Sequence, residues 1–289
     1  MKTLAAIVDS PPASPFCVLH AQPEPPSPLV FDSPHSGTHW PAGATPAAVP
    51  PDALDSCWSA YVDALWAEAI VPCPSSHRGM GLIRRDALPG LPIYRAALSV
   101  QEVQRRIDQC YDPYHAALDR LIGAAQAHHG LCVHVVCLSM KSVGNAMNDD
   151  AGQPRPDFVL SDLNGGSAEP FLLRWMAAAL GATGHSVRIN RPYRGDELLR
   201  RHGQPALGRH SVQIAVNRAL YMHEAGCVRH GGYARLLRHL AHFVRQLDAG
   251  LRAELRPASC LSRPPLAPLP GRAASPADAT LPRPCCASG

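Results

Sequence analysis

LCVHVVCLSM, residues 131–140, is the stretch that decides the fold class of this chain. It is a continuous apolar run of strand length that is rich in valine, and such runs are typical of strands buried inside a sheet protein. Residues 99–129 before it and 171–180 after it carry apolar side chains at helical spacing. A buried strand between amphipathic helices predicts a three-layer α/β domain.

The same alternation of elements continues outward along the chain. Ser99 stands before Val100-Gln101-Glu102 as a helix cap, and Pro113 is expected to kink or reset the long helix that follows. Ser167 is expected to cap the helix over 171–180. We expect further strands at residues 29–31, at the start of 157–170, at 185–190 and at 210–222, further helices at 52–70 and 231–255, and a loop at 190–203.

Length and composition predict one soluble domain with a proline-rich extension at each end. Of the 289 residues, 1–28 are expected to form a proline-rich arm, 29–255 a single domain, and 256–289 a disordered tail rich in proline and alanine. The net charge is +4 without a basic stripe, so nucleic acid is not an expected partner. Neither a membrane span nor an export signal is visible, so we expect a cytoplasmic protein whose ten cysteines are reduced.

A histidine follows the first of the expected strands. Val30-Phe31-Asp32 runs into Ser33-Pro34-His35-Ser36-Gly37, which sets His35 on a tight turn at the carboxyl end of that strand. Sites in α/β proteins are built at the carboxyl ends of strands. His35 is either a metal ligand or a histidine that belongs only to the turn, and the motif alone leaves both interpretations open.

Seven stretches in collinear order resemble the N-formylglutamate amidohydrolase (deformylase) family. They are SPHSG (33–37), GLIRR…LPIY (81–94), SVQEVQRRI…YDPYH..L (99–118), LSMKS (138–142), DFVLSDLNGGS (157–167), NRPYRGDELLRRHG (190–203) and GRHSVQIAVNRALYM (208–222). The resemblance covers roughly residues 15–250 and implies a zinc-carboxypeptidase-like α/β/α fold with a central mixed sheet. It also implies hydrolysis of the formyl C–N bond of N-formyl amino acids such as N-formylglutamate, in histidine degradation.

Most of the catalytic positions that this resemblance implies are substituted. The family's reaction needs zinc with three protein ligands, and a carboxylate that transfers the proton of the bound water. The first ligand position holds His35, but the second, expected to be acidic, holds Ser59, and the third, expected to be histidine, holds Leu138. The position of the catalytic glutamate holds Ala215, and Val136 replaces the carboxylate that would orient the third ligand.

The sequence shows no set of residues that would rebuild this site. A family segment of the form R-x-x-x-D-x-N-R is not found in the short stretch 67–80. Four other side chains could in principle supply a ligand or a base: Asp32, Asp63, His134 and Glu224. His134 lies about 13 Å along its strand from Leu138, and Glu224 lies beyond the expected end of the strand that carries Ala215. The two aspartates alone would hold zinc poorly.

Other positions correspond to the family's substrate-facing residues. They are Asn190, Tyr193, Arg194, Gln213 and Arg218. An arginine would clamp a substrate carboxylate through two hydrogen bonds. The alternative for the loop that begins at Asn190 is a structural turn set by its proline and glycine, and the alternative for Arg218 is an ion pair with Asp162.

Three further features carry weaker functional interpretations. His115 is expected to pack in a helix at the edge of the cleft. Cys137 lacks a visible base that would make it a nucleophile, and the loop at Gly165-Gly166 lacks the lysine and the spacing of a phosphate-binding loop.

The substitutions predict a protein that keeps the family's fold without its chemistry. Loss of an acid–base residue alone costs about 10²–10⁴-fold in rate, and apolar side chains at Leu138 and Ala215 avoid the cost of burying unpaired charges. We therefore expect no cofactor, with zinc only if the site is rebuilt, and a small acidic amino-acid derivative as a ligand. The alternatives are an active, metal-dependent amidohydrolase and a decayed gene product that barely folds.

Overall fold

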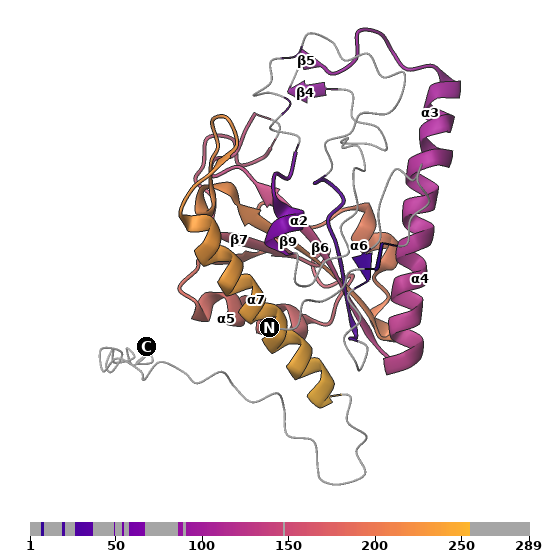
Figure 1. Cartoon of the computed structure of the whole chain (residues 1–289), viewed down its shortest axis with the longest axis vertical. Coiled ribbons are helices and arrows are strands. Elements are labelled where there is room, and N and C mark those ends of the chain that lie inside the picture. The colour runs from indigo at the N-terminus through magenta and orange to yellow at the C-terminus, as the bar shows by residue number, and fades with distance from the viewer. Residues whose placement is uncertain are drawn as a thin grey trace, which may run out of the picture. The chain divides into compact units, whose positions relative to one another are not determined.

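The computed structural model describes residues 27–36, 58–66, 91–146 and 148–254, together with residues 7–8, 19–20, 49, 54 and 86–88. A five-stranded sheet lies at its centre (Figure 1). The strands, in spatial order, are β3 (Leu29–Asp32), β6 (Cys132–Met140), β9 (Arg209–Asn217), β7 (Phe158–Ser161) and β8 (Val187–Ile189). Only the pair β7 and β9 is antiparallel, so the sheet is mixed, as the resemblance implied.

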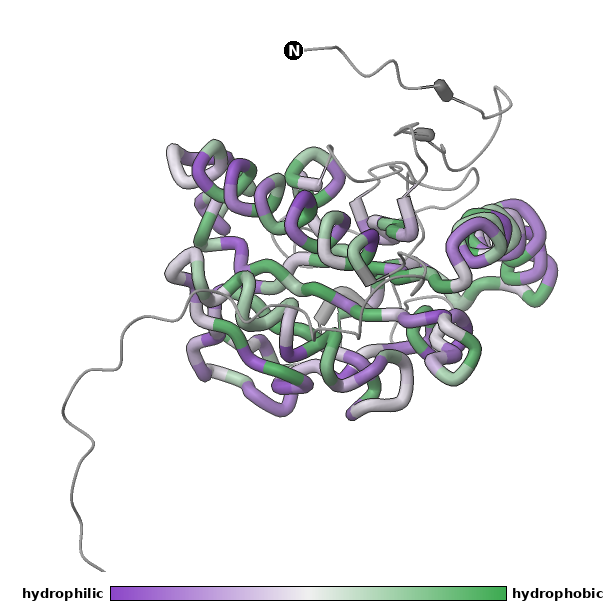
Figure 2. Tube along the Cα trace, turned by 90° about the horizontal axis from the view of Figure 1, so that it is seen from below, coloured by the Kyte–Doolittle hydropathy of each residue, from purple (hydrophilic) through white to green (hydrophobic). Residues whose placement is uncertain are grey.

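Helices cover both faces of this sheet (Figure 1). The helices are α2 (Val62–Leu65), α3 (Val100–Arg106), α4 (Asp112–His129), α5 (Pro170–Ala182), α6 (Glu197–His202) and α7 (Gly232–Glu254). Helices α4 and α6 pack on one face, and α7, which contacts α2 and α5, packs on the other. Figure 2 shows the hydrophobic residues gathered along the central strands and the polar residues on the outer turns of the helices. The expected α/β/α architecture is confirmed.

The central position of β6 fits its apolar content. Residues 132–137 of β6 are all buried, and β6 lies between β3 and β9, where both of its faces are covered. On the face of α7, Phe31 lies 5.7 Å from the ring of Trp66, which in turn lies 6.2 Å from Phe243. These three aromatic side chains join β3, α2 and α7 into one core.

The long helix predicted over 99–129 forms with the cap and the break that its residues indicate. The hydroxyl of Ser99 accepts a hydrogen bond from the Glu102 backbone N–H at 3.1 Å. Between α3 and α4 a π-helical turn, η1 (Ile107–Tyr111), ends directly before α4, which carries Pro113 in its first turn. The proline has no N–H to donate, so the chain resets its hydrogen bonding there.

The structure corrects four of the predicted elements. The helix predicted over 52–70 is wrong at 58–61, which form a turn, and the loop predicted over 190–203 contains α6. The strand predicted over 210–222 ends at Asn217 and continues as the 3₁₀ turn η3 (Arg218–Leu220). Ser167 does not cap α5, because its hydroxyl donates to the Ser211 carbonyl at 2.7 Å and the helix begins after Glu169.

Short hairpins complete the described chain. They are β1 (Ile7–Val8) with β2 (Leu19–His20), β4 (Asp86–Leu88) with β5 (Leu91–Pro92), and β10 (Met222–His223) with β11 (Val228–Arg229). A further 3₁₀ turn, η2 (Pro205–Leu207), precedes β9. The predicted tail, most of the predicted arm and residues 67–85 lie outside the described residues. Among the helices that the structure describes, none has the length and apolar content of a membrane span.

Candidate functional site

The parallel strands direct four sequence-predicted positions to one edge of the sheet. Strands β3, β6 and β9 run parallel, so their carboxyl ends share an edge. Leu138 of β6 lies directly beside Ala215 of β9. Ser59 accepts a hydrogen bond from the Ser139 backbone N–H at 3.1 Å and donates its own N–H to the His35 carbonyl at 2.9 Å. The structure thus brings together the four positions that the resemblance assigned to the metal and the base.

An apolar cluster occupies the β6 and β9 part of this edge. Met140, Val159 and Ala215 are buried against one another, and the side chains of Leu138 and Tyr193 pack on them. The hydrocarbon side chains of Leu138 and Ala215 cannot ligate a metal or accept a proton, so these two positions offer no acid–base chemistry.

The turn at 58–61 forms the other half of the site and is fixed from several directions. Trp58 donates its indole N–H to the Ser36 carbonyl at 2.8 Å, and the hydroxyl of Tyr221 donates to the Ala60 carbonyl at 2.9 Å. Tyr61 adopts φ of 60° and donates its hydroxyl to the Cys227 carbonyl at 2.9 Å. Both ends of the turn are therefore tied to segments far away in the sequence.

Arg218 is part of this framework. It is 2% exposed, and its guanidinium donates to the Ser139 hydroxyl at 3.0 Å and to the Trp58 carbonyl. The predicted ion pair with Asp162 is wrong. Because β7 runs antiparallel to β9, Ser161 lies opposite Gln213, which places Asp162 at the far end of the strand from Arg218.

The loop after β8 is built as a structural turn. The carboxylate of Asp162 accepts hydrogen bonds from the side-chain amide of Asn190 at 2.7 Å and from the Gly165 N–H at 2.9 Å. Tyr193 stacks under the Arg155 guanidinium, which lies 5.1 Å from the ring centroid, while its carbonyl accepts from Ser161 at 2.9 Å.

The remaining predicted substrate residues separate in space. Arg194 is exposed, and its carbonyl accepts from the Leu163 N–H at 2.7 Å. Gln213 is 4% exposed and lies beside Val136 in the interior of the sheet. The five residues thus do not form one exposed surface.

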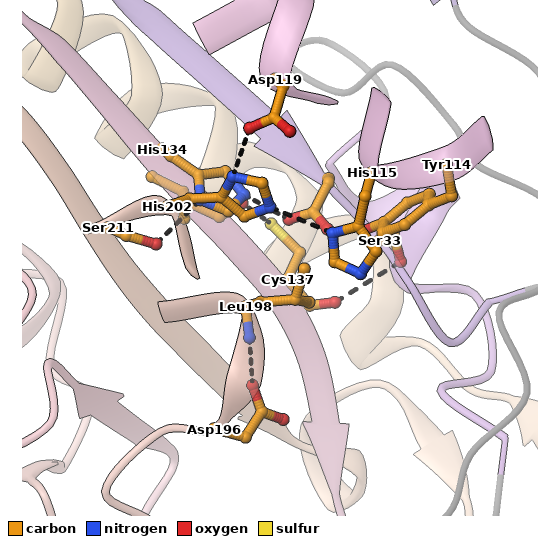
Figure 3. A network of polar contacts seen from close by, with 12 residues as sticks. Ser33, Tyr114, His115, Asp119, His134, Cys137, Asp196, Leu198, His202 and Ser211 are labelled. Atoms are coloured by element: carbon orange, nitrogen blue, oxygen red, sulfur yellow. Dashed lines mark hydrogen bonds and ion pairs between the residues drawn. The ribbon is translucent and has the colours of Figure 1, made fainter. Parts of the chain in front are cut away.

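A buried polar network lies between the sheet and the helices α4 and α6 (Figure 3). His134 contacts the Ser211 hydroxyl at 2.8 Å through Nδ1 and the Asp32 carboxylate at 3.0 Å through Nε2, and Tyr114 donates to the same carboxylate. His115 lies 3.2 Å from His202. Asp32 and His134, two of the side chains considered as replacement zinc ligands, are thus hydrogen-bonded within this network.

The same network shifts the titration of its histidines. Burial lowers the pKa of His115 to about 4, with the nearby charge of Arg201 acting in the same direction. Burial and the neighbouring His134 lower the pKa of His202 to about 4 as well, although His202 contacts the Asp119 carboxylate at 3.1 Å. Both imidazoles are therefore neutral near pH 7.

Sequence reasoning missed most of this network. His115 was expected at the edge of a cleft, but it is 3% exposed. The sequence signal that could have revealed the network is His134, a histidine within an apolar strand. A buried polar group needs hydrogen-bond partners, so this histidine indicates that polar side chains pack against the strand. Its partners could not be identified, because Asp32 and Ser211 are more than 75 residues away in the sequence.

Glu224 and Asp63 remain as carboxylates considered for the site. Glu224 is predicted to lie too far from Ala215, beyond the end of that strand. The chain reverses after β9, however, and Glu224 accepts a hydrogen bond from the Ser142 N–H at 2.7 Å, just beyond the end of β6. Asp63 lies in the first turn of α2 and is partly buried.

Comparisons with known proteins agree with this architecture. A sequence model of the family described as N-formylglutamate amidohydrolase matches residues 68–222. The crystal structure of N-formylglutamate amidohydrolase from Ralstonia eutropha JMP134 has 33% sequence identity and a TM-score of 0.70, and the match covers 79% of this chain and 95% of that one. The chain belongs to the N-formylglutamate amidohydrolase family.

Two other proteins resemble this member of the N-formylglutamate amidohydrolase family. N-formylglutamate deformylase from Pseudomonas putida is 30% identical over 147 residues, which are 50% of this chain and 54% of that protein. The chain thus matches about half the length of this curated relative. The gene product Atu2144 from Agrobacterium tumefaciens, with 18% identity over 79% of this chain and 92% of its own, shares the fold with a TM-score of 0.60.

The side chains at the family's zinc positions do not fit a zinc ion in this chain. Zinc takes thiolate, imidazole or carboxylate ligands, and a catalytic site uses three of them. The positions offer one imidazole from His35, the Ser59 hydroxyl, which already accepts a hydrogen bond, and the hydrocarbon of Leu138. Within the described parts of the chain, no group of three or more His, Cys, Asp or Glu side chains is arranged to hold a metal.

Proposed function

We propose that this chain is a non-catalytic member of the N-formylglutamate amidohydrolase family. The observation that carries the proposal is the packing of Leu138 beside Ala215, with Met140, Val159 and Tyr193, where the family's reaction requires a ligand and a base. A metal-activated water needs three ligands and a proton acceptor. The chain supplies one imidazole at these positions, so hydrolysis by the family's route has no chemical basis here.

The retained role in this proposal is binding. A small acidic amino-acid derivative is the ligand class that the family implies, and the protein would be cytoplasmic. The turn at 58–61 and the buried Arg218 support a preserved scaffold around the former site, because hydrogen bonds connect these residues to distant segments.

Elemental analysis together with an assay of formate release tests the proposal. The purified protein, with and without added zinc, is expected to carry no zinc that depends on His35. It should release no more formate from N-formyl-L-glutamate than a heat-denatured sample. About one zinc per chain that disappears in His35→Ala, together with formate release, would contradict the proposal.

A restored variant provides the matched positive control. Ser59→Glu combined with Leu138→His returns an acid and an imidazole to the positions beside His35, giving three ligands of the kinds that zinc prefers. Zinc uptake by this double variant, and its loss when His35→Ala is added, would show that the two substitutions removed the metal.

An active amidohydrolase is the second candidate function, and one observation favours it. Glu224 folds back to the carboxyl end of β6, where it binds the Ser142 N–H. A carboxylate at this edge is a candidate base. Formate release by the unmodified protein that is lost in Glu224→Gln would establish this alternative, whereas equal background in both proteins would exclude it.

A further inference from the structure

Two imidazoles face each other on the opposite side of the sheet from α4 and α6. His185 precedes β8, and His239 lies on α7, 54 residues further along the chain. His185 Nε2 and His239 Nδ1 are 3.0 Å apart. The two nitrogens share a hydrogen bond. Two nitrogens bound to one ion at about 2.0–2.1 Å each are about 2.8–3.4 Å apart in octahedral or tetrahedral geometry. The separation therefore also suits two ligands on one metal ion, which would take the place of the shared proton.

Hydrogen bonds at the start of β7 hold His185 in place. The Asp157 carboxylate accepts a hydrogen bond from the Ser186 N–H, and the Asp157 N–H donates to the Ser186 hydroxyl, both at 2.9 Å. The Asp157 carboxylate lies 3.5 Å from His185 Nδ1, and the ring of Phe158 packs edge-on against the imidazole. A carboxylate beside Nδ1 favours the tautomer that leaves the Nε2 lone pair facing His239, as in histidines that bind zinc.

Arg235 and Arg238 lie near His239 on α7 and would repel a cation. Arg235 and Arg238 are exposed, so salt at physiological strength screens their repulsion of a cation. The His185 side chain is 11% exposed, and His239 is partly exposed on α7, so the pair lies close to the protein surface.

We propose that His185 and His239 form a binding site for a divalent late transition-metal ion such as Zn²⁺, Ni²⁺ or Cu²⁺, with Asp157 orienting His185. Imidazole nitrogens suit these ions. No group of three or more potential ligands exists among the described residues, so water or an external ligand would complete the coordination. This site is separate from the His35 edge and does not depend on the proposed loss of catalysis.

Calorimetric titration of the full chain with Zn²⁺ alone, repeated with Cu²⁺ and followed by electron paramagnetic resonance, tests the proposal. Affinity should fall at least about tenfold in His185→Gln and in His239→Gln. In Asp157→Asn it should fall about 10–100-fold, as expected when the group that orients a ligand is lost. The resonance spectrum of the Cu²⁺ complex should lose its coupling to two nitrogens in either histidine variant, a change that a purely structural role would not produce.

Two control variants separate this site from other histidines. His242→Gln removes an exposed histidine from the same helix, and His35→Ala removes the histidine of the former active site. Both should bind the ions as the unmodified protein does. Equal affinity in His185→Gln and the unmodified protein would overturn the proposal, and so would the absence of any binding. Binding that is lost only in His35→Ala would overturn it too, and would count against the proposed function instead.

Discussion

At the scale of single residues, Leu138 and Ala215 show how a site loses its chemistry while its strands keep their packing. The two lie side by side on neighbouring parallel strands, and each contacts the same small apolar cluster. A charged ligand left in such a place without its metal would be buried and unpaired, at a cost of several kcal/mol. Aliphatic replacements remove that cost and contribute burial of their own.

Arg218 provides a residue-scale prediction. Arg218→Met should lower the free energy of unfolding by about 1–3 kcal/mol, because it leaves the Trp58 carbonyl and the Ser139 hydroxyl without this donor. Urea denaturation measures the change. The exposed Arg194→Met is the matched control and should change stability by less than about 0.5 kcal/mol. Equal effects of the two substitutions would show that Arg218 does not hold the turn at 58–61.

At the scale of elements, the polar network fixes how α4 and α6 lie on the sheet. Tyr114 of α4 bonds Asp32 of β3, and His115 of the same helix contacts His202 of α6. Around these contacts the two helices bury leucine side chains against Val30 and Val136. Directional hydrogen bonds thus set the position of helices whose main stabilisation comes from apolar burial.

The buried histidines predict an acid-sensitive packing of these elements. The pKa of His115 and of His202 is about 4 in the folded protein against 6.5 ordinarily, so the unfolded chain binds protons first as the pH falls. The stability that these two groups contribute is present above about pH 6.5 and is lost progressively as the pH falls toward 4. Urea midpoints measured across this range should therefore decline with falling pH.

Substitution separates this effect from general acid denaturation. In His202→Gln the decline between pH 6.5 and 4 should be shallower than in the unmodified protein, whatever the absolute stability of the variant. His223→Gln, at an exposed position, should leave the slope unchanged. An unaltered slope in His202→Gln would show that the interior histidines do not control this pH dependence.

At the scale of the whole molecule, we expect the hydrophobic core to hold the fold without the family's metal. The core runs through both faces of a five-stranded sheet and includes Phe31, Trp66 and Phe243 on one side and the leucines of α4 on the other. Apolar burial of this extent stabilises a domain without a metal ion.

Removal of metal ions with a chelator tests whether the stability of the fold is independent of a metal ion. Protein prepared without added metal should unfold in one cooperative thermal transition, with the same midpoint in the presence and absence of EDTA, because a metal stabilises only a fold that binds it. A midpoint that falls on chelation in the unmodified protein and equally in His185→Gln would reveal a structural metal outside the proposed site at His185 and His239. A broad transition in both conditions would instead favour the decayed gene product.

The sequence by itself determined the features that depend on local spacing. The valine-rich run at 131–140 predicted β6, Ser99 predicted the start of α3, and the resemblance carried by the motifs predicted the family and the mixed sheet. These features can be recognised in the sequence alone, because a strand period, a helix cap or a motif involves residues only a few positions apart.

Only the tertiary structure decided which distant residues meet. The antiparallel course of β7 separates Arg218 from Asp162, and the register of β6 with β9 places Leu138 against Ala215. Partners such as those of His134, or His239 beside His185, depend on strand order and helix docking, which the whole chain sets at once. No local pattern carries that information, because contacts between distant segments follow from the packing of the complete sheet and its helices.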